Sequence, residues 1–153
     1  MIKELINVGL IDLELDARTK EGAFNKLAHL LKKQGNIEDY HFFLEDILER
    51  EDLGSTGFGF GIAIPHAKSL FVKHPAIAFG RSKHGIDYDS IDHKPVYLIF
   101  MIAMPNDNSK QHLLALAWLS RHLMHEPFRN ALLEANTKDE VMRILIVAEE
   151  NAS

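Results

Sequence analysis

The sequence predicts an α/β fold: a single domain over residues 1–153, with a mixed central sheet sandwiched between helices. Short runs rich in Ile, Val, Phe and Tyr lie in the middle of the chain, bounded by Gly and Pro. Segments whose apolar residues recur at helical spacing lie on either side of them. No repeat, low-complexity stretch or linker divides the chain, and 153 residues suit one hydrophobic core.

The amino-terminal third predicts one strand and two helices. Residues 11–16, IDLELD, alternate apolar and acidic side chains as a half-buried strand does. Thr19 is of the right type to cap a helix that continues to about Gln34. A second helix, from Asp39 to about Glu51, places Arg50 at its carboxyl end, directly before a glycine-rich loop.

The middle of the chain predicts three strands, with the sequences GIAIP, PAIAFG and VYLIFMIAMP. The third is apolar throughout, which is typical of a central strand covered on both faces. Too few residues separate two of these strands for a helical crossover, so we expect part of the sheet to be antiparallel.

The remaining residues predict three helices. The first begins at an Asn108 or Ser109 cap, and its expected core-facing positions are Leu113, Leu116, Ala117 and 119–123. The second runs from Glu126 to about Ala135, with a proline tolerated in its first turn. The third begins at residues 137–140, TKDE, which have the spacing of a capping box.

Composition excludes several classes of function. There are no cysteines, which rules out disulfides, thiolate zinc sites and thiol nucleophiles. The formal net charge of -5 and the lack of a basic block argue against a nucleic-acid partner. The longest apolar run, residues 96–104, is about half of what a membrane-spanning helix needs. We therefore expect a cytoplasmic protein with no membrane insertion.

His66 lies near the end of residues 54–68, GSTGFGFGIAIPHAK, where Pro65 restricts the backbone just before the imidazole. We expect the glycines to let backbone N–H groups point at an anion. His112 lies at the start of a predicted helix, where anions are favoured, and Arg50 offers a planar fork of donors. Together they suit a phosphoryl group carried on a histidine nitrogen; the alternative is a histidine that merely packs at a strand end.

Other patterns are incomplete. The glycine-rich segment lacks the lysine and hydroxyl that end a nucleotide P-loop, and Ser55 lacks the flanks of a hydrolase nucleophile. His122 and His125 could share a metal on one helix, but no further ligand completes the site. Residues 87–92, DYDSID, are interpreted as a solvated turn rather than a calcium loop. We expect neither a metal nor another cofactor, and interpret the remaining histidines as surface or half-buried residues.

Residues 50–68, REDLGSTGFGFGIAIPHAK, resemble the active-site signature of the enzyme IIA component, fructose/mannitol class, of the bacterial phosphoenolpyruvate-dependent sugar phosphotransferase system. The resemblance continues through residues 75–105 and 112–141, so it spans nearly the whole chain. It implies a phosphoryl relay: the histidine-containing phosphocarrier protein phosphorylates His66, which passes the group to a cysteine on the IIB domain of a sugar permease of the fructose type. Carried over by motif, His66 is the nucleophile, His112 the second active-site histidine, and Arg50 the arginine before the glycine loop.

The resemblance leaves two points open. Relatives that regulate nitrogen metabolism share the signature, so the alternative is a regulatory binding protein that is switched by phosphorylation. Phe60 stands where the family commonly has asparagine, in GIGNGIAIPH. We also expect an exposed apolar patch around the site for transient docking, with Phe58, Phe60 and Leu70 as its candidates and core packing as their alternative role.

Overall fold

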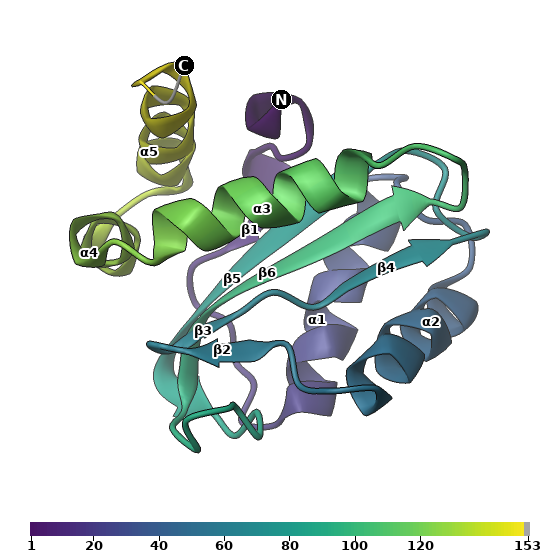
Figure 1. Ribbon diagram of the computed structural model, residues 1–153, viewed down its shortest axis with the longest axis horizontal. Helices are drawn as coiled ribbons and strands as arrows, with labels where there is room; N and C mark the ends of the chain where they lie inside the picture. The colour runs from purple at the N-terminus through teal and green to yellow at the C-terminus, as the bar shows by residue number, and fades with distance from the viewer. Residues whose placement is uncertain (152–153) are drawn as a thin grey trace.

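The computed structural model, which describes residues 1–151, confirms a mixed sheet between helical layers (Figure 1). The strands are β1 (Ile11–Asp12), β2 (Gly57–Gly59), β3 (Ile62–Ala63), β4 (His66–Ser69), β5 (Ala76–Ile86) and β6 (Val96–Pro105). Their order is β1-β5-β6-β3-β2, and β4 continues past β3 along the same edge of β6. The expected antiparallel part is the β5–β6 pair, while β1 pairs with β5, and β3 and β4 with β6, in parallel.

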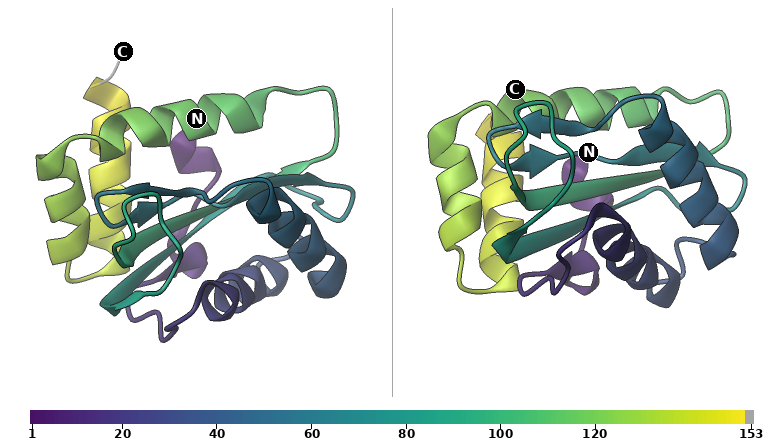
Figure 2. Two further views of the ribbon diagram at one scale, coloured as in Figure 1. Left: turned by 60° about the horizontal axis from the view of Figure 1, so that its bottom comes forward. Right: turned by 90° about the horizontal axis from the view of Figure 1, so that it is seen from below.

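Helices cover both faces of this sheet (Figure 2). Helices α1 (Lys20–Lys33) and α2 (Tyr40–Asp52) lie on one face, and α3 (Gln111–Leu123) crosses the other. Helices α4 (Glu126–Glu134) and α5 (Lys138–Asn151) extend the layer beyond the β1 side. Two short 3-10 helices, Ile2–Glu4 and Val8–Leu10, precede β1. Within residues 1–151, no helix is both long enough and apolar enough to span a bilayer.

The predicted helix starts are confirmed at the amino-terminal end. The Thr19 side chain accepts a hydrogen bond from the Gly22 amide at 3.1 Å, and Asp39 accepts one from the Phe42 amide at 2.9 Å. Such caps satisfy amides that the helix itself leaves without a partner. Because Asp39 fixes where α2 starts, it also fixes the helix phase that presents Arg50.

The strand expected over residues 11–16 is shorter than predicted, and β1 ends at Asp12. The Asp12 carboxylate accepts the Glu14 amide at 3.0 Å, a local turn that competes with the strand ladder. Helix α3 also differs from its prediction. It begins after Lys110 without a side-chain cap, and its buried residues are Ala115, Trp118, Leu119 and Leu123.

The predicted core-facing positions of α3 were therefore wrong at Leu113 and Ala117. Leu113 is 49% exposed and Ala117 is also exposed, because Ala115 and Trp118 define the stripe that packs on β6. This rotation brings the first turn of α3, with His112 and Leu113, to a pocket at the edge of the sheet.

The glycine-rich segment forms the β2–β3 hairpin. A Cβ atom on Gly57 would lie 2.5 Å from Ser90 Oγ and 3.0 Å from Ser90 Cα, so only glycine fits there. Residues 59–61 all have positive φ, and Phe60, at 59°, is a bulky residue in the left-handed region. Asparagine, which the family commonly has there, adopts this conformation more easily. Arg129 covers the Phe60 ring at 4.8 Å, a contact that partly offsets the strain.

Candidate active site

His66 is the first residue of β4 and lies opposite Ile102 of the central strand. The carbonyl of Pro65 accepts the Ile102 amide at 2.9 Å, which holds the backbone just before the histidine against β6. The ring Nδ1 lies 2.8 Å from the carbonyl oxygen of Ile64. A carbonyl can only accept, so Nδ1 carries the proton and Nε2 keeps its lone pair. The backbone thus selects the imidazole tautomer that is nucleophilic at Nε2.

The three residues expected in the site come together in one pocket of about 410 Å³. Arg50 reaches it from the carboxyl end of α2, His66 from β4, and His112 from the first turn of α3. The other residues that line it are Asp46, Glu49, Leu53, Ala67, Lys68 and Leu113. Elements on both faces of the sheet therefore converge at one edge of β6.

Arg50 is held by the loop that follows its own helix. Its Nη1 donates to the carbonyl oxygen of Gly54 at 3.0 Å. A guanidinium has five N–H donors, so this bond orients the group and leaves donors for an anion.

The surroundings of both histidines lower the imidazole pKa and so favour the neutral form. Burial lowers the pKa of His66, and the positive charge of Arg50 and the neighbouring His112 lower it further against the opposing pull of the Ile64 carbonyl and Glu51. Burial also lowers the pKa of His112, with Lys68 adding to the shift and Asp107 opposing it. His112 Nδ1 is buried and has no hydrogen-bond partner within the described residues. A neutral His66 is the form that can attack phosphorus.

A buried polar network lies beside Arg50, and sequence reasoning missed it. Glu51 Oε2 accepts the Thr56 amide at 2.9 Å and Lys20 Nζ at 3.1 Å, while its Oε1 accepts the Thr56 hydroxyl at 2.6 Å. The Tyr88 hydroxyl lies 2.7 Å from that of Thr56, and burial raises the pKa of Tyr88. A charged residue directly after Arg50, on the buried side of α2, was the only sequence signal for it.

This network closes the loop that anchors Arg50. Glu51, at the end of α2, accepts hydrogen bonds from Thr56, which lies just before β2. Gly54 lies between these two residues in the chain. The carbonyl that orients Arg50 therefore belongs to a segment fixed at both of its ends.

The glycines and the expected docking residues lie outside the pocket that contains His66. No glycine lines the pocket, because the glycines shape the hairpin beyond it. Phe58 and Phe60 are exposed as predicted, but they line a different pocket with Tyr97. Leu70 is also exposed and does not line the His66 pocket. The apolar side chains beside His66 are instead Leu53, which is 83% exposed, and Leu113.

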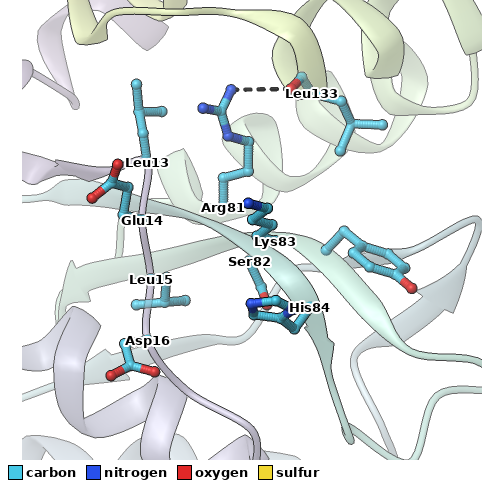
Figure 3. A pocket seen from close by; sticks show the side chains of 10 residues that line it. Leu13, Glu14, Leu15, Asp16, Arg81, Ser82, Lys83, His84 and Leu133 are labelled. Atoms are coloured by element: carbon cyan, nitrogen blue, oxygen red, sulfur yellow. Dashed lines mark hydrogen bonds between the residues drawn. The ribbon is translucent and has the colours of Figure 1, made fainter.

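A larger pocket, of about 550 Å³, lies elsewhere between β5 and the segment after β1 (Figure 3). Glu14, Asp16, Lys83 and His84 line it together with Arg81. Arg81 Nη1 donates to the carbonyls of Leu132, Leu133 and Ala135 at 3.0, 3.1 and 2.6 Å. Its charge is thus used to cap the carboxyl end of α4, where helix carbonyls lack partners.

Replacing Arg81 with alanine is expected to lower the free energy of unfolding by about 2 kcal/mol, because three carbonyls lose their shared donor. Urea unfolding followed by circular dichroism measures this. Lys83→Ala, an exposed neighbour on the same strand, serves as the matched control and should change stability by less than about 0.5 kcal/mol. Equal effects of the two substitutions would contradict the capping role of Arg81.

Within residues 1–151, no group of three or more His, Cys, Asp or Glu side chains is arranged to hold a metal ion. The site therefore offers an oriented imidazole, a second imidazole and two cationic side chains, Arg50 and Lys68. This combination is typical of a protein that carries a phosphoryl group on histidine.

Comparisons with known proteins agree with that class. Residues 4–147 match the family described as "Phosphoenolpyruvate-dependent sugar phosphotransferase system, EIIA 2", and the chain belongs to this family. It is 46% identical over 144 residues to the fructose-specific EIIA component of Haloferax volcanii, covering 94% of each chain. It is 45% identical to the fructose-specific EIIABC component of Bacillus subtilis, of whose length it spans 23%. The family is one of phosphotransferases, as the sequence resemblance implied.

Solved structures share the fold. The nitrogen regulatory protein IIA-Ntr of Neisseria meningitidis superimposes with a TM-score of 0.88 at 32% identity, over 94% of this chain and 98% of that one. The mannitol enzyme IIA of Escherichia coli, in its complex with phosphorylated enzyme IIB, gives 0.78 at 25% identity, over 92% and 96%. The fold and the family predicted from the sequence are thus confirmed.

Proposed function

We propose that His66 receives a phosphoryl group from a histidine-containing phosphocarrier protein and passes it to the IIB component of a fructose-type sugar permease. The single observation that carries the assignment to His66 is its geometry. Nδ1 is held by the Ile64 carbonyl, and Nε2 is left free beside Arg50 and His112. The role as a phosphoryl relay follows from the family, and its relatives of 45% and 46% identity are both fructose-specific.

Each transfer exchanges one bond to phosphorus for another. The lone pair of His66 Nε2 attacks, the N–P bond to the donor histidine breaks, and the donor imidazole leaves with the electron pair. In the second step a IIB cysteine thiolate attacks, forming an S–P bond while the bond to Nε2 breaks. The Nδ1 proton stays on its ring throughout, held by the Ile64 carbonyl. Arg50 and His112 stabilise the charge that spreads over the phosphoryl oxygens.

The proposed partners are proteins, and the proposed location is the cytoplasm. A neighbouring structure is a mannitol IIA bound to phosphorylated IIB, which supports a IIB acceptor for this chain. The exposed Leu53 and Leu113 flank the site and offer apolar area for such brief contacts.

The test reconstitutes the relay with the wild-type chain. Phosphoenolpyruvate, enzyme I, the phosphocarrier protein and a fructose-type IIB are combined, and each protein is followed by intact mass. We expect one acid-labile phosphoryl group on the chain, which then appears on IIB. A folded chain that never gains this mass, with a carrier shown to be phosphorylated, would rule the relay out.

A second candidate is a regulatory role, favoured by the TM-score of 0.88 to the Neisseria meningitidis protein. It predicts that the phosphorylated chain keeps its group in the presence of IIB and changes its affinity for another protein instead. The same experiment separates the two roles, since only the relay passes the group on.

A further inference from the structure

Lys68 is a cation of the pocket to which no role has yet been given. It lies two residues after His66 on β4, and alternate residues of a strand point to the same face. Lys68 lines the same pocket as Arg50, His66 and His112. Its charge contributes to the lowered pKa of His112, which places the ammonium group near the second histidine.

The ammonium group of Lys68 has hydrogen-bond donors that it does not use within the chain. Its hydrogen bond goes from Nζ to the carbonyl oxygen of Asp107, at 2.5 Å, in the segment that leads into α3. A lysine carries three donors, so two remain. Among residues 1–151, neither Lys68 nor Arg50 has a carboxylate partner within 4.0 Å. Both charges are therefore uncompensated by an ion pair while His66 carries nothing.

The two cations, Arg50 and Lys68, can balance the negative charge of a phosphoryl group on His66. A phosphoryl group brings close to two negative charges into a pocket whose surroundings favour the neutral form of both imidazoles. Two further pocket residues, Asp46 and Glu49, are acidic and would repel it. Arg50 supplies one positive charge, and Lys68 brings the total to two, which matches the charge of the phosphoryl group itself.

We propose that Lys68 is a phosphoryl-binding residue, whose Nζ donates to an oxygen of the group on His66 while it keeps its bond to the Asp107 carbonyl. This rests on the proposed function. No covalent bond to Lys68 forms or breaks during transfer, and no proton leaves it. Through Asp107, the same ammonium group also ties β4 to the segment that delivers His112, so it joins the two histidine-bearing elements across the phosphoryl group.

The test compares Lys68→Met with Lys68→Arg, and uses Lys73→Met as a control that removes the same charge from an exposed position. We expect Lys68→Met to slow phosphorylation of His66 about 10- to 100-fold, Lys68→Arg to recover most of the rate, and Lys73→Met to match the wild type. Lys68→Gln replaces the methionine variant if that one does not fold.

A ³¹P titration of the phosphorylated chain separates phosphoryl contact from simple tethering of the loop. Loss of a neighbouring cation raises the pKa of the phosphoryl oxygens, so the titration midpoint should rise in Lys68→Met and not in Lys73→Met. A rate within twofold of wild type, or a slower rate with an unchanged midpoint, would overturn the proposal and leave the relay intact. A wild-type chain that takes up no phosphoryl group would overturn both.

Discussion

Substituting His66 with alanine is expected to abolish phosphorylation of the chain completely. In the proposed relay the covalent bond is to Nε2, and no other pocket residue offers an imidazole whose tautomer is fixed by a backbone carbonyl. Intact mass after incubation with phosphoenolpyruvate, enzyme I and the phosphocarrier protein measures the result. The fold should be retained, because His66 is only half-buried and its backbone bonds in β4 do not depend on the ring.

His112→Ala is the matched comparison for that experiment. It removes a stabilising group and keeps the nucleophile, so the chain should still be phosphorylated, but about 10²- to 10³-fold more slowly. The two variants should differ in what they lose. His66→Ala should never become phosphorylated, whereas His112→Ala should reach the same final level of phosphorylation at a lower rate. An acid-labile phosphoryl group on His66→Ala would place the nucleophile elsewhere.

Replacing Glu51 with alanine is expected to lower the free energy of unfolding by about 3 kcal/mol. The carboxylate is buried and accepts from the Thr56 amide, the Thr56 hydroxyl and Lys20. Removing it leaves a buried amide and a largely buried ammonium group without their partner, which is the costly way to break such a pair. Urea unfolding monitored by fluorescence of Trp118 and by circular dichroism gives the value.

Glu45→Ala is the control, because Glu45 is an exposed acid of the same helix. It should cost less than about 0.5 kcal/mol. Thr56→Val keeps the carboxylate and removes only the hydroxyl, so it should fall between the two, at about 1 to 2 kcal/mol. Equal stability of Glu51→Ala and Glu45→Ala would show that the network does not hold the loop.

The sequence predicted correctly those features of the fold that depend on residues close together in the chain. The caps at Thr19 and Asp39 each involve an amide three residues away, and both helix starts were predicted correctly. The central position of β6 followed equally well from its unbroken apolar run. The phase of α3 could not be obtained this way, since leucines occupy several of its faces and only packing against β6 selects Ala115 and Trp118.

For the candidate site, too, local sequence signals revealed some residues, and contacts between distant residues remained hidden. His66, Arg50 and His112 were predicted because each stands at a recognisable end of an element. The Glu51 network was missed because it joins Lys20, Thr56 and Tyr88, which are far apart in the chain. The steric reason for Gly57 was missed as well. Gly57 is required by the Ser90 backbone beside it, a neighbour that the sequence separates by many residues.

Strand β6 positions both histidines. His66 is in register with Ile102 on its edge, and the chain that leaves β6 at Pro105 leads directly into the helix that carries His112. The two imidazoles are thus set by separate means, one by a ladder of backbone bonds and the other by the length of a short connection. A change in the length of residues 106–110 is therefore expected to move His112 and to leave His66 in place.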